Sequence, residues 1–257
     1  MPKVKLYGYA TSPYVRKTAC FLHYKKIPFE YIPVNPINPK ETIGFTGNTR
    51  VPILQIDDEW RVESSEHAHW LDELFPEYTL CPNEYKQKII EVDTWLNRVF
   101  LPSIFRSVID GKLNLNARMR YWRLAAIVSS QTPLPEKIRH QWPEILMQAS
   151  FIQKMGEDMD LTEDPKDMQM RIGMELVTHI GDGPFIASME CPTMLDFAVF
   201  PQVVFGVMAG LEDKLLAAMH PVLKNWIKAV AKHLPENPIL IPNYMIVKTV
   251  DQAIYEI

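Results

Sequence analysis

The chain has 257 residues and a formal net charge of −4, with 47% hydrophobic and 23% charged residues. This is the composition of an ordinary soluble globular protein, and its weak acidity gives no reason to expect nucleic acid or an anionic membrane surface as a partner. Because no run of about 18 apolar residues occurs, we expect no segment that spans a bilayer.

Cysteine and histidine residues are few and scattered. Cys20, Cys81 and Cys191 do not have the spacing of a disulfide framework or a zinc site. His67 and His69 are two residues apart and would face different sides of a helix, while the remaining histidines have no partner at ligand spacing. The N-terminus lacks the basic-then-apolar pattern of a secretory signal. We therefore expect no metal site and a cytoplasmic location.

The first 75 residues alternate strand and helix patterns. Residues 4–9, VKLYGY, have strand character, and a helical stripe follows from Pro13, whose missing N–H costs nothing in a first helical turn. KKIP at 25–28 ends that helix, and FEYIPV at 29–34 is a second predicted strand. A strand, a helix and a strand within about 30 residues form a βαβ unit, so these two strands should be parallel.

A hairpin and a further helix complete this part of the chain. VPILQI at 51–56 and EWRV at 59–62 are predicted to pair through a two-residue turn. Residues 64–76 form a helical pattern that begins at a serine and stops at a proline. The order βαβ followed by ββα predicts a small α/β domain with a mixed sheet over residues 1–77.

Strand patterns largely vanish after about residue 84. Helical periodicity is found instead in six segments, at 89–99, 117–128, 144–155, 167–180, 192–208 and 220–234. Clusters of proline mark the loops between them. We therefore predict an all-helical second domain over residues 84–257.

The dipeptide Val51-Pro52 has two interpretations. An ordinary trans proline at the first position of a strand needs no function, because its missing N–H is tolerated there. A cis bond would instead turn the N–H and C=O of Val51 outward, where an extended, peptide-like ligand could pair with them as an added strand.

The pair Glu63 and Ser64 stands where a strand ends and a helix begins. The serine hydroxyl and the free N–H groups of a helix start can bind a carboxylate, and Glu63 could receive an ammonium group. The alternative is a plain N-cap beside an acid. Further along, Thr193 and Asp196 match a capping box, for which we expect a structural role only.

Taken in order, these segments resemble the cytosolic glutathione transferase superfamily over most of the chain, and in particular its bacterial serine-type members. The resembling motifs are SPYVRK (12–17), KKIPFE (25–30), RVPIL (50–54), ESSEHAHWLDE (63–73) and GPFIASMECPTMLDFAV (183–199). The resemblance implies a thioredoxin-like, glutathione-binding domain at 1–77, followed by an all-helical domain at 84–257 that forms the pocket for a hydrophobic electrophile.

The resemblance also implies which residues meet glutathione. The expected contacts are Ser12 at the sulfur, Val51 and Pro52 at the cysteinyl backbone, Glu63 and Ser64 at the γ-glutamyl end, and Arg50 at the glycyl carboxylate. Tyr7 and Tyr9 are alternatives to Ser12, because some members use a tyrosine of the first strand. Four aromatic residues could line the electrophile pocket or pack in the core: Trp95, Phe100, Phe105 and Trp122.

The expected activity is that of a glutathione S-transferase, in which Ser12 stabilises the thiolate of the cosubstrate rather than attacking. Disulfide exchange is disfavoured, because the helix start carries serine where that chemistry needs cysteine. The alternatives are a non-catalytic glutathione-binding or stress-related protein and a glutathione-dependent etherase, dehalogenase or isomerase. The segment 41–50 departs from the family pattern. The resemblance further implies a homodimer with a role in detoxification.

Overall fold

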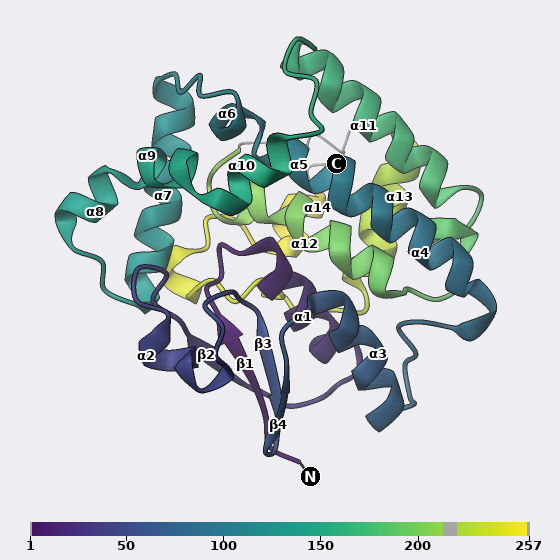
Figure 1. Cartoon of the computed structure of the whole chain (residues 1–257). Coiled ribbons are helices and arrows are strands. Elements are labelled where there is room, and N and C mark those ends of the chain that lie inside the picture. The colour runs from purple at the N-terminus through teal and green to yellow at the C-terminus, as the bar shows by residue number, and fades with distance from the viewer. Residues whose placement is uncertain (1, 213–219, 256–257) are drawn as a thin grey trace.

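The computed structural model describes residues 2–212 and 220–255, and it contains one four-stranded sheet in its N-terminal part (Figure 1). The elements of this part are β1 (Val4–Gly8), α1 (Pro13–Tyr24), β2 (Glu30–Pro33), β3 (Ile53–Ile56), β4 (Glu59–Arg61) and α3 (Ser64–Leu74). The strand order is β2-β1-β3-β4. β1 pairs with β2 in parallel and with β3 antiparallel, and β3 and β4 form an antiparallel hairpin. The predicted βαβ-ββα arrangement is confirmed.

The segment between β2 and β3 is more ordered than its sequence indicated. It contains α2 (Lys40–Ile43) and the 3-10 turn η1 (Gly44–Thr46). Ile43 is fully buried and packs with Tyr7 and Ile53 on the face of the sheet opposite α1. A helix of four residues is too short to show a 3.6-residue hydrophobic period, so the sequence contained no sign of it.

The rest of the described chain is helical, as predicted. Its α-helices are α4 (Lys86–Trp95), α5 (Leu101–Ile104), α6 (Arg106–Ile109), α7 (Leu115–Gln131), α8 (Glu136–His140), α9 (Trp142–Gln148), α10 (Ser150–Gly156), α11 (Pro165–Ile180), α12 (Met194–Met208), α13 (Pro221–Ala231) and α14 (Val250–Tyr255). A π-helical turn, η3 (Leu96–Phe100), joins α4 to α5, and 3-10 turns lie at 83–85, 186–188 and 243–245. None of the described helices is long and apolar enough to cross a bilayer.

One predicted helix is wrong in its extent. The segment 144–155 is not continuous, because Ala149 is extended (φ −67°, ψ 124°) and separates α9 from α10. The bend lets Ile152 of α10 reach a second apolar cluster that it shares with Tyr121 and Trp142. Tertiary packing therefore overrides a helical pattern that looks uninterrupted in the sequence.

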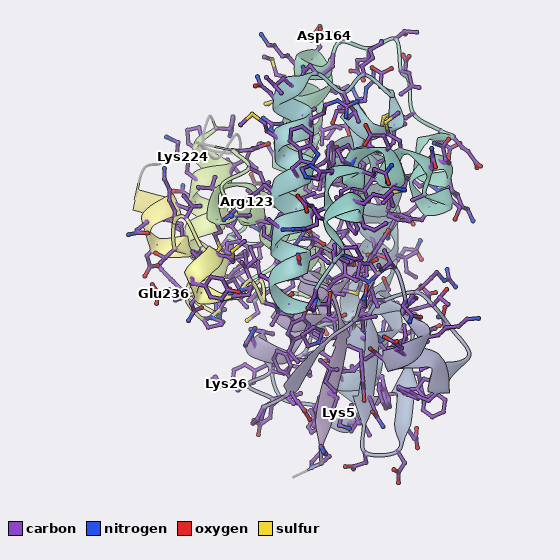
Figure 2. All side chains as sticks on the ribbon, turned by 90° about the vertical axis from the view of Figure 1, so that its left-hand side faces the viewer. Lys5, Lys26, Arg123, Asp164, Lys224 and Glu236 are labelled. Atoms are coloured by element: carbon purple, nitrogen blue, oxygen red, sulfur yellow. The ribbon has the colours of Figure 1, made fainter. Side chains whose placement is uncertain are left out.

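Helix α1 lies between the sheet and the helical half, against α12 (Figure 1). The ring of Phe197 packs within 4.9 Å of Tyr24 and 6.3 Å of Phe21, measured between ring centroids. One apolar core thus runs from β1 to α14. Seen from the side, the sheet with Lys5 lies at one end of the molecule and the helices that reach Asp164 at the other (Figure 2).

The start of α12 is the capping box that the sequence predicted. The carboxylate of Asp196 accepts a hydrogen bond from the backbone N–H of Thr193 at 2.8 Å, and the Thr193 hydroxyl caps the helix in return. The other carboxylate oxygen accepts from the Ile186 N–H and from Nε1 of Trp226. This buried carboxylate fixes three segments of the helical half, which is a structural role.

Candidate functional site

The start of α1 is the first component of the candidate site. Ser12 occupies the N-cap position, is only 6% exposed, and makes no side-chain capping bond. Its backbone N–H donates to the carbonyl of Tyr9 at 2.9 Å. Pro13 at the first helical position has no N–H, and helix geometry leaves the N–H groups of Tyr14 and Val15 without partners inside the helix. The hydroxyl of Ser12 and two amides therefore stand at the positive end of a helix dipole.

The two alternative tyrosines lie in different environments. The Tyr7 hydroxyl donates to Oε1 of Gln55 at 2.7 Å, and its ring belongs to the cluster on the α2 face of the sheet. Tyr9 lies in the turn between β1 and α1, and burial raises the pKa of its phenol to about 12. The phenol of Tyr9 thus remains protonated, and the Tyr9 backbone contacts that of Ser12, whereas the hydroxyl of Tyr7 already has a partner.

The peptide bond between Val51 and Pro52 is cis. β1 and β3 pair Tyr7 with Ile53, and extending this antiparallel register puts Pro52 beside Gly8 and Val51 beside Tyr9. Neither the N–H nor the C=O of Val51 is hydrogen-bonded to another residue in the described part of the chain. The cis-proline segment therefore adjoins the turn that leads into Ser12, with one free backbone donor and one free acceptor.

The predicted acid–serine pair opens α3, as expected, but not as a serine N-cap. Glu63 is the N-cap residue, Ser64 is the first helical residue, and no side chain caps this end. The Glu63 carboxylate lies 3.7 Å from the Arg50 guanidinium, and both side chains are more than half exposed. Burial raises the pKa of Tyr14, and the charges of Asp93 and, to a smaller extent, of Glu63 raise it further. The starts of α1 and α3 and the end of the 41–50 segment thus converge.

A polar cluster below these helix starts was not predicted. Nζ of Lys17 donates to Oδ1 of Asp93 at 3.1 Å and to the Ser65 hydroxyl at 3.0 Å, and Ser65 donates to Oδ2 of Asp93 at 3.1 Å. These bonds tie α1, α3 and α4 together beneath Glu63 and Ser64. The only signal in the sequence was two consecutive cations, Arg16 and Lys17, inside a helix with an apolar stripe.

The four aromatic residues proposed for the pocket separate into two groups. The rings of Trp95 and Phe100 lie 6.0 Å apart, and Nε1 of Trp95 donates to Glu175. Phe105 packs with the second apolar cluster, and Nε1 of Trp122 donates to the carbonyl of His140. Trp95 and Phe100 are therefore together on the helix that continues from α4, while Phe105 and Trp122 belong to the region around α7 to α10.

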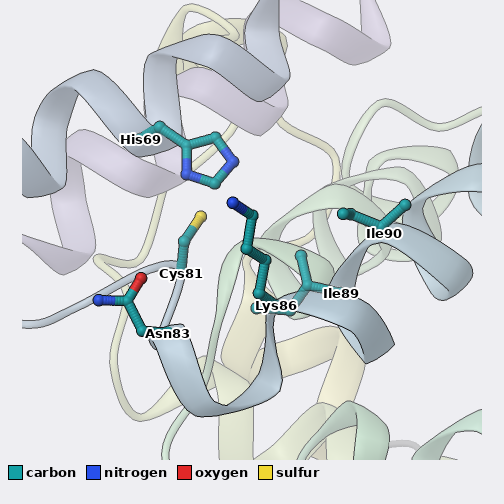
Figure 3. A pocket seen from close by; sticks show the side chains of 6 residues that line it. All are labelled: His69, Cys81, Asn83, Lys86, Ile89 and Ile90. Atoms are coloured by element: carbon teal, nitrogen blue, oxygen red, sulfur yellow. The ribbon is translucent and has the colours of Figure 1, made fainter.

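Two cavities lie elsewhere. One, of about 100 Å³, lies between α3 and α4, where His69, Cys81 and Lys86 point toward one another (Figure 3). Burial raises the pKa of the Cys81 thiol to about 12, so it is not poised as a nucleophile. The other, of about 510 Å³, is an open groove between the β3–β4 hairpin and α3. Ser12 lines neither cavity.

Among the residues that the structure describes, the site does not contain the side chains of a metal centre. Within residues 2–212 and 220–255, no group of three or more histidine, cysteine or acidic side chains is arranged to hold a metal ion. The described cysteines are free. What the site offers is therefore hydrogen-bond donors at two helix starts, the free N–H and C=O of Val51, and one exposed charge of each sign.

Residues 6–79 match the family model described as glutathione S-transferase, N-terminal domain. The chain is 21% identical to mouse (Mus musculus) prostaglandin E synthase 2 over 92% of its own length and 71% of that protein. It is 35% identical to the zebrafish (Danio rerio) prostaglandin E synthase 2 over 24% of its length, a segment that spans only 16% of that protein.

Solved structures with the same fold cover nearly the whole chain. Human glutathione transferase theta-2, in complex with glutathione, has a TM-score of 0.60 at 16% identity, over 91% of this chain and 84% of its own. A beta-etherase from Sphingobium sp. strain SYK-6 has a TM-score of 0.57 at 18% identity, over 90% and 98%.

A third structure carries a glutathione derivative. Maleylacetoacetate isomerase from Anaeromyxobacter dehalogenans, with bound dicarboxyethyl glutathione, has a TM-score of 0.53 at 17% identity, over 94% of both chains. The theta-2 transferase, the etherase and the isomerase share the sheet domain followed by the helical domain with this protein. Residues 6–79 therefore match a glutathione S-transferase N-terminal domain, and the chain as a whole has the fold of the glutathione transferase structures.

Proposed function

We propose that this protein is a serine-type glutathione S-transferase, which binds glutathione at the start of α1 and stabilises its thiolate for attack on a hydrophobic electrophile. The observation that carries the proposal is the convergence of a free hydroxyl, a free backbone donor and acceptor, and an exposed ion pair. These are the Ser12 hydroxyl, the free backbone of Val51 before a cis proline, and the Arg50–Glu63 pair at the start of α3.

Each group suits one part of glutathione. The N–H and C=O of Val51 can pair with the cysteinyl residue as an added strand, which brings the sulfur toward Ser12. Glu63 can accept the γ-glutamyl ammonium, and Ser64 with the free amides of α3 can donate to its carboxylate. Arg50 can receive the glycyl carboxylate.

The energies required are within reach of this site. A cysteine thiol titrates near about 8.5, and lowering its pKa by roughly two units requires about 2.7 kcal/mol of preference for the anion. One hydrogen bond to a charged group contributes about 1.5–3 kcal/mol, and a helix N-terminus about 0.3–1 kcal/mol. Ser12 as a donor, together with the amides of α1, is therefore sufficient, and no protein nucleophile or base is needed.

The helical half, residues 84–257, would supply the pocket for the electrophile. Trp95 and Phe100 are the aromatic pair on the continuous helix from α4 to α5 and are our candidates for its lining. The proposal includes a cytoplasmic homodimer that acts in detoxification. Light scattering on the purified protein checks the dimer, with a mass of twice 29.8 kDa expected.

A second candidate function keeps the thiolate and changes the reaction. The beta-etherase and the maleylacetoacetate isomerase share this fold, so glutathione-dependent ether cleavage or isomerisation are the alternatives that the comparisons favour. All of these reactions begin with the same glutathione thiolate and differ in the electrophile that the helical half accepts.

The proposal is tested by titrating the ultraviolet absorbance of the glutathione thiolate bound to wild type, Ser12→Ala and Tyr9→Phe. We expect a bound thiol pKa about two units below that of free glutathione in wild type and in Tyr9→Phe, and a value near that of free glutathione in Ser12→Ala. An unchanged pKa in Ser12→Ala removes Ser12 from the role.

Turnover is measured separately with a panel of aromatic halides, aryl ethers and maleyl isomerisation substrates. Conjugation products are expected from the transferase, and cleavage or isomerised products from the alternatives. Glutathione binding without turnover on any of them contradicts the enzymatic proposal and favours a binding protein.

A further inference from the structure

Helix α1 buries two consecutive cations, and only one of them has a counter-charge. The Lys17 ammonium pairs with Asp93, a carboxylate on α4. Arg16 is only 3% exposed, and no carboxylate lies within ion-pair distance of it among residues 2–212 and 220–255. A buried cation without a partner anion is costly, so its retention in this position needs a reason.

The contacts of Arg16 are all with neutral groups. Nη1 donates to the carbonyl of Ala10 at 3.0 Å, while Nε and Nη2 donate to Oε1 of Gln202 at 3.1 and 2.5 Å. The guanidinium also stacks 3.7 Å from the ring centroid of Phe205. Burial lowers the pKa of Arg16 to about 9, which leaves it charged at neutral pH, and burial raises the pKa of the nearby Cys20 thiol, which leaves that group neutral.

These contacts put the charge directly behind the start of α1. Ala10 lies two residues before Ser12, and the amide of Gln202 that binds Arg16 also donates to the carbonyl of Pro13 at 3.0 Å. The backbone N–H of Arg16 donates to the carbonyl of Ser12 at 3.2 Å. The guanidinium, the Gln202 amide and the first turn of α1 therefore form one rigid polar unit.

Resting on the proposed function, we propose that Arg16 is a positioning residue whose uncompensated charge stabilises the thiolate of glutathione bound at Ser12. The thiol proton passes to solvent, and the resulting sulfur anion supplies the counter-charge that Arg16 lacks within the protein. Ser12 and the helix amides touch the sulfur, whereas Arg16 acts through the helix start from behind. Gln202 and Phe205 belong to α12, so the helical half takes part in tuning the thiol.

The test compares variants that separate charge from shape. Arg16→Gln removes the charge, Arg16→Lys keeps it without the planar fork, and Gln202→Glu adds a carboxylate beside Arg16. We expect the bound thiol pKa to rise by about one unit in Arg16→Gln and Gln202→Glu, and by less than half of that in Arg16→Lys. Gln131→Glu is the matched control, because Gln131 joins Tyr31 to the carbonyl of Leu240 and does not contact Arg16.

A second measurement compares two ligands that differ only in the charge on sulfur. At a pH above the bound thiol pKa, Arg16→Gln should weaken the binding of glutathione by about tenfold and leave that of S-methylglutathione within about twofold. If Arg16→Gln weakens the binding of both ligands equally, or if the bound thiol pKa rises as much in Arg16→Lys as in Arg16→Gln, the role of Arg16 is structural. Either result overturns the inference and leaves the proposed function standing. Failure of wild type to bind either ligand overturns both.

Discussion

Gly8 and Val15 are in such close contact that a Cβ atom at position 8 would overlap the Val15 side chain unless one of them shifts. A Cβ atom built on Gly8 would lie 2.3 Å from Cγ2 of Val15, well inside any permitted carbon–carbon distance. Gly8 ends β1 and Val15 lies in the first turn of α1. The missing side chain therefore lets the start of α1 sit directly on the strand, which sets the position of Ser12.

The contact between Gly8 and Val15 should affect the free energy of unfolding. Gly8→Ala should lower the free energy of unfolding by about 1–3 kcal/mol, because the β-branched side chain of Val15 has little freedom to move aside. Gly8→Ala combined with Val15→Ala should recover much of that loss. Urea denaturation of wild type, Gly8→Ala, Val15→Ala and the double variant measures it, and losses that simply add in the double variant would show that the two residues do not interact.

The Lys17–Asp93 pair predicts strong coupling between α1 and α4. The two side chains are 5% and 20% exposed, so the removal of either charge leaves the other buried and unpaired. Lys17→Met should cost about 3 kcal/mol of unfolding free energy, and Lys17→Met with Asp93→Leu should cost much less. Denaturant titration checks both. If the double variant were as unstable as Lys17→Met, the attraction between the two charges would itself stabilise the packing of α1 on α4. The loss in the single variant would then not come from a buried charge left unpaired.

The exposed Arg50–Glu63 pair should matter for ligand binding and little for stability. Ion pairs this exposed contribute at most about 1 kcal/mol. We expect Arg50→Ala and Glu63→Gln to weaken glutathione binding about tenfold, because each loses a hydrogen bond to a charged end of the ligand.

Truncated ligands assign each residue to one end of glutathione. Glu63→Gln should have no effect on the affinity for cysteinylglycine, which lacks the γ-glutamyl group, and Arg50→Ala none on that for γ-glutamylcysteine. Calorimetry measures the four affinities. The reverse pattern would show that the tripeptide binds in the opposite direction.

We expect the protein to lose stability in acid because of His67, which is fully buried, and His23, which is half-buried. Burial lowers the pKa of His67 and of His23 from 6.5 to about 4. Between these pH values the unfolded chain binds protons that the folded chain does not, so the free energy of unfolding should fall as the pH falls. For His67 the slope is about 1 kcal/mol per pH unit. Urea denaturation between pH 7 and 4.5 measures it.

The variant His67→Gln isolates this contribution. The ring nitrogens of His67 contact the Thr18 hydroxyl and the Arg61 carbonyl. A glutamine amide can make part of these contacts in place of the ring. Asp196 acts in the opposite direction, because burial raises its pKa to about 6 and the folded chain then holds a proton that the unfolded chain has lost. This contribution is the same in wild type and in the variant, so it cancels in their difference. If the free energy of unfolding of the variant fell as steeply with falling pH as that of wild type, His67 would not remain neutral in the folded state.

The sequence predicted most of the fold because its signals were local. Strand boundaries were within two residues, and the cis proline and the acid–serine helix start lie where the family resemblance implied. The four-residue α2 and the break at Ala149 were missed, since one has no period and the other depends on how Ile152 packs.

The environment of the candidate site depended on contacts between distant segments. Arg16 and Lys17 have the pattern of ordinary surface cations, and only the packing of α12 and α4 on α1 shows that they are buried. Gln202 stood out as an amide in an apolar segment, but nothing in the sequence pairs it with a residue 186 positions earlier. The local sequence pattern therefore indicates which side chains form the site, whereas tertiary packing determines which of the charged ones are buried and which have a partner of opposite charge.

A crystal structure with bound glutathione tests the role of Ser12 by direct observation. We expect the sulfur within hydrogen-bond distance of Oγ of Ser12, with the cysteinyl backbone paired to the N–H and C=O of Val51. A sulfur bound by the Tyr9 hydroxyl with Ser12 turned away, or glutathione bound away from the start of α1, would contradict this expectation.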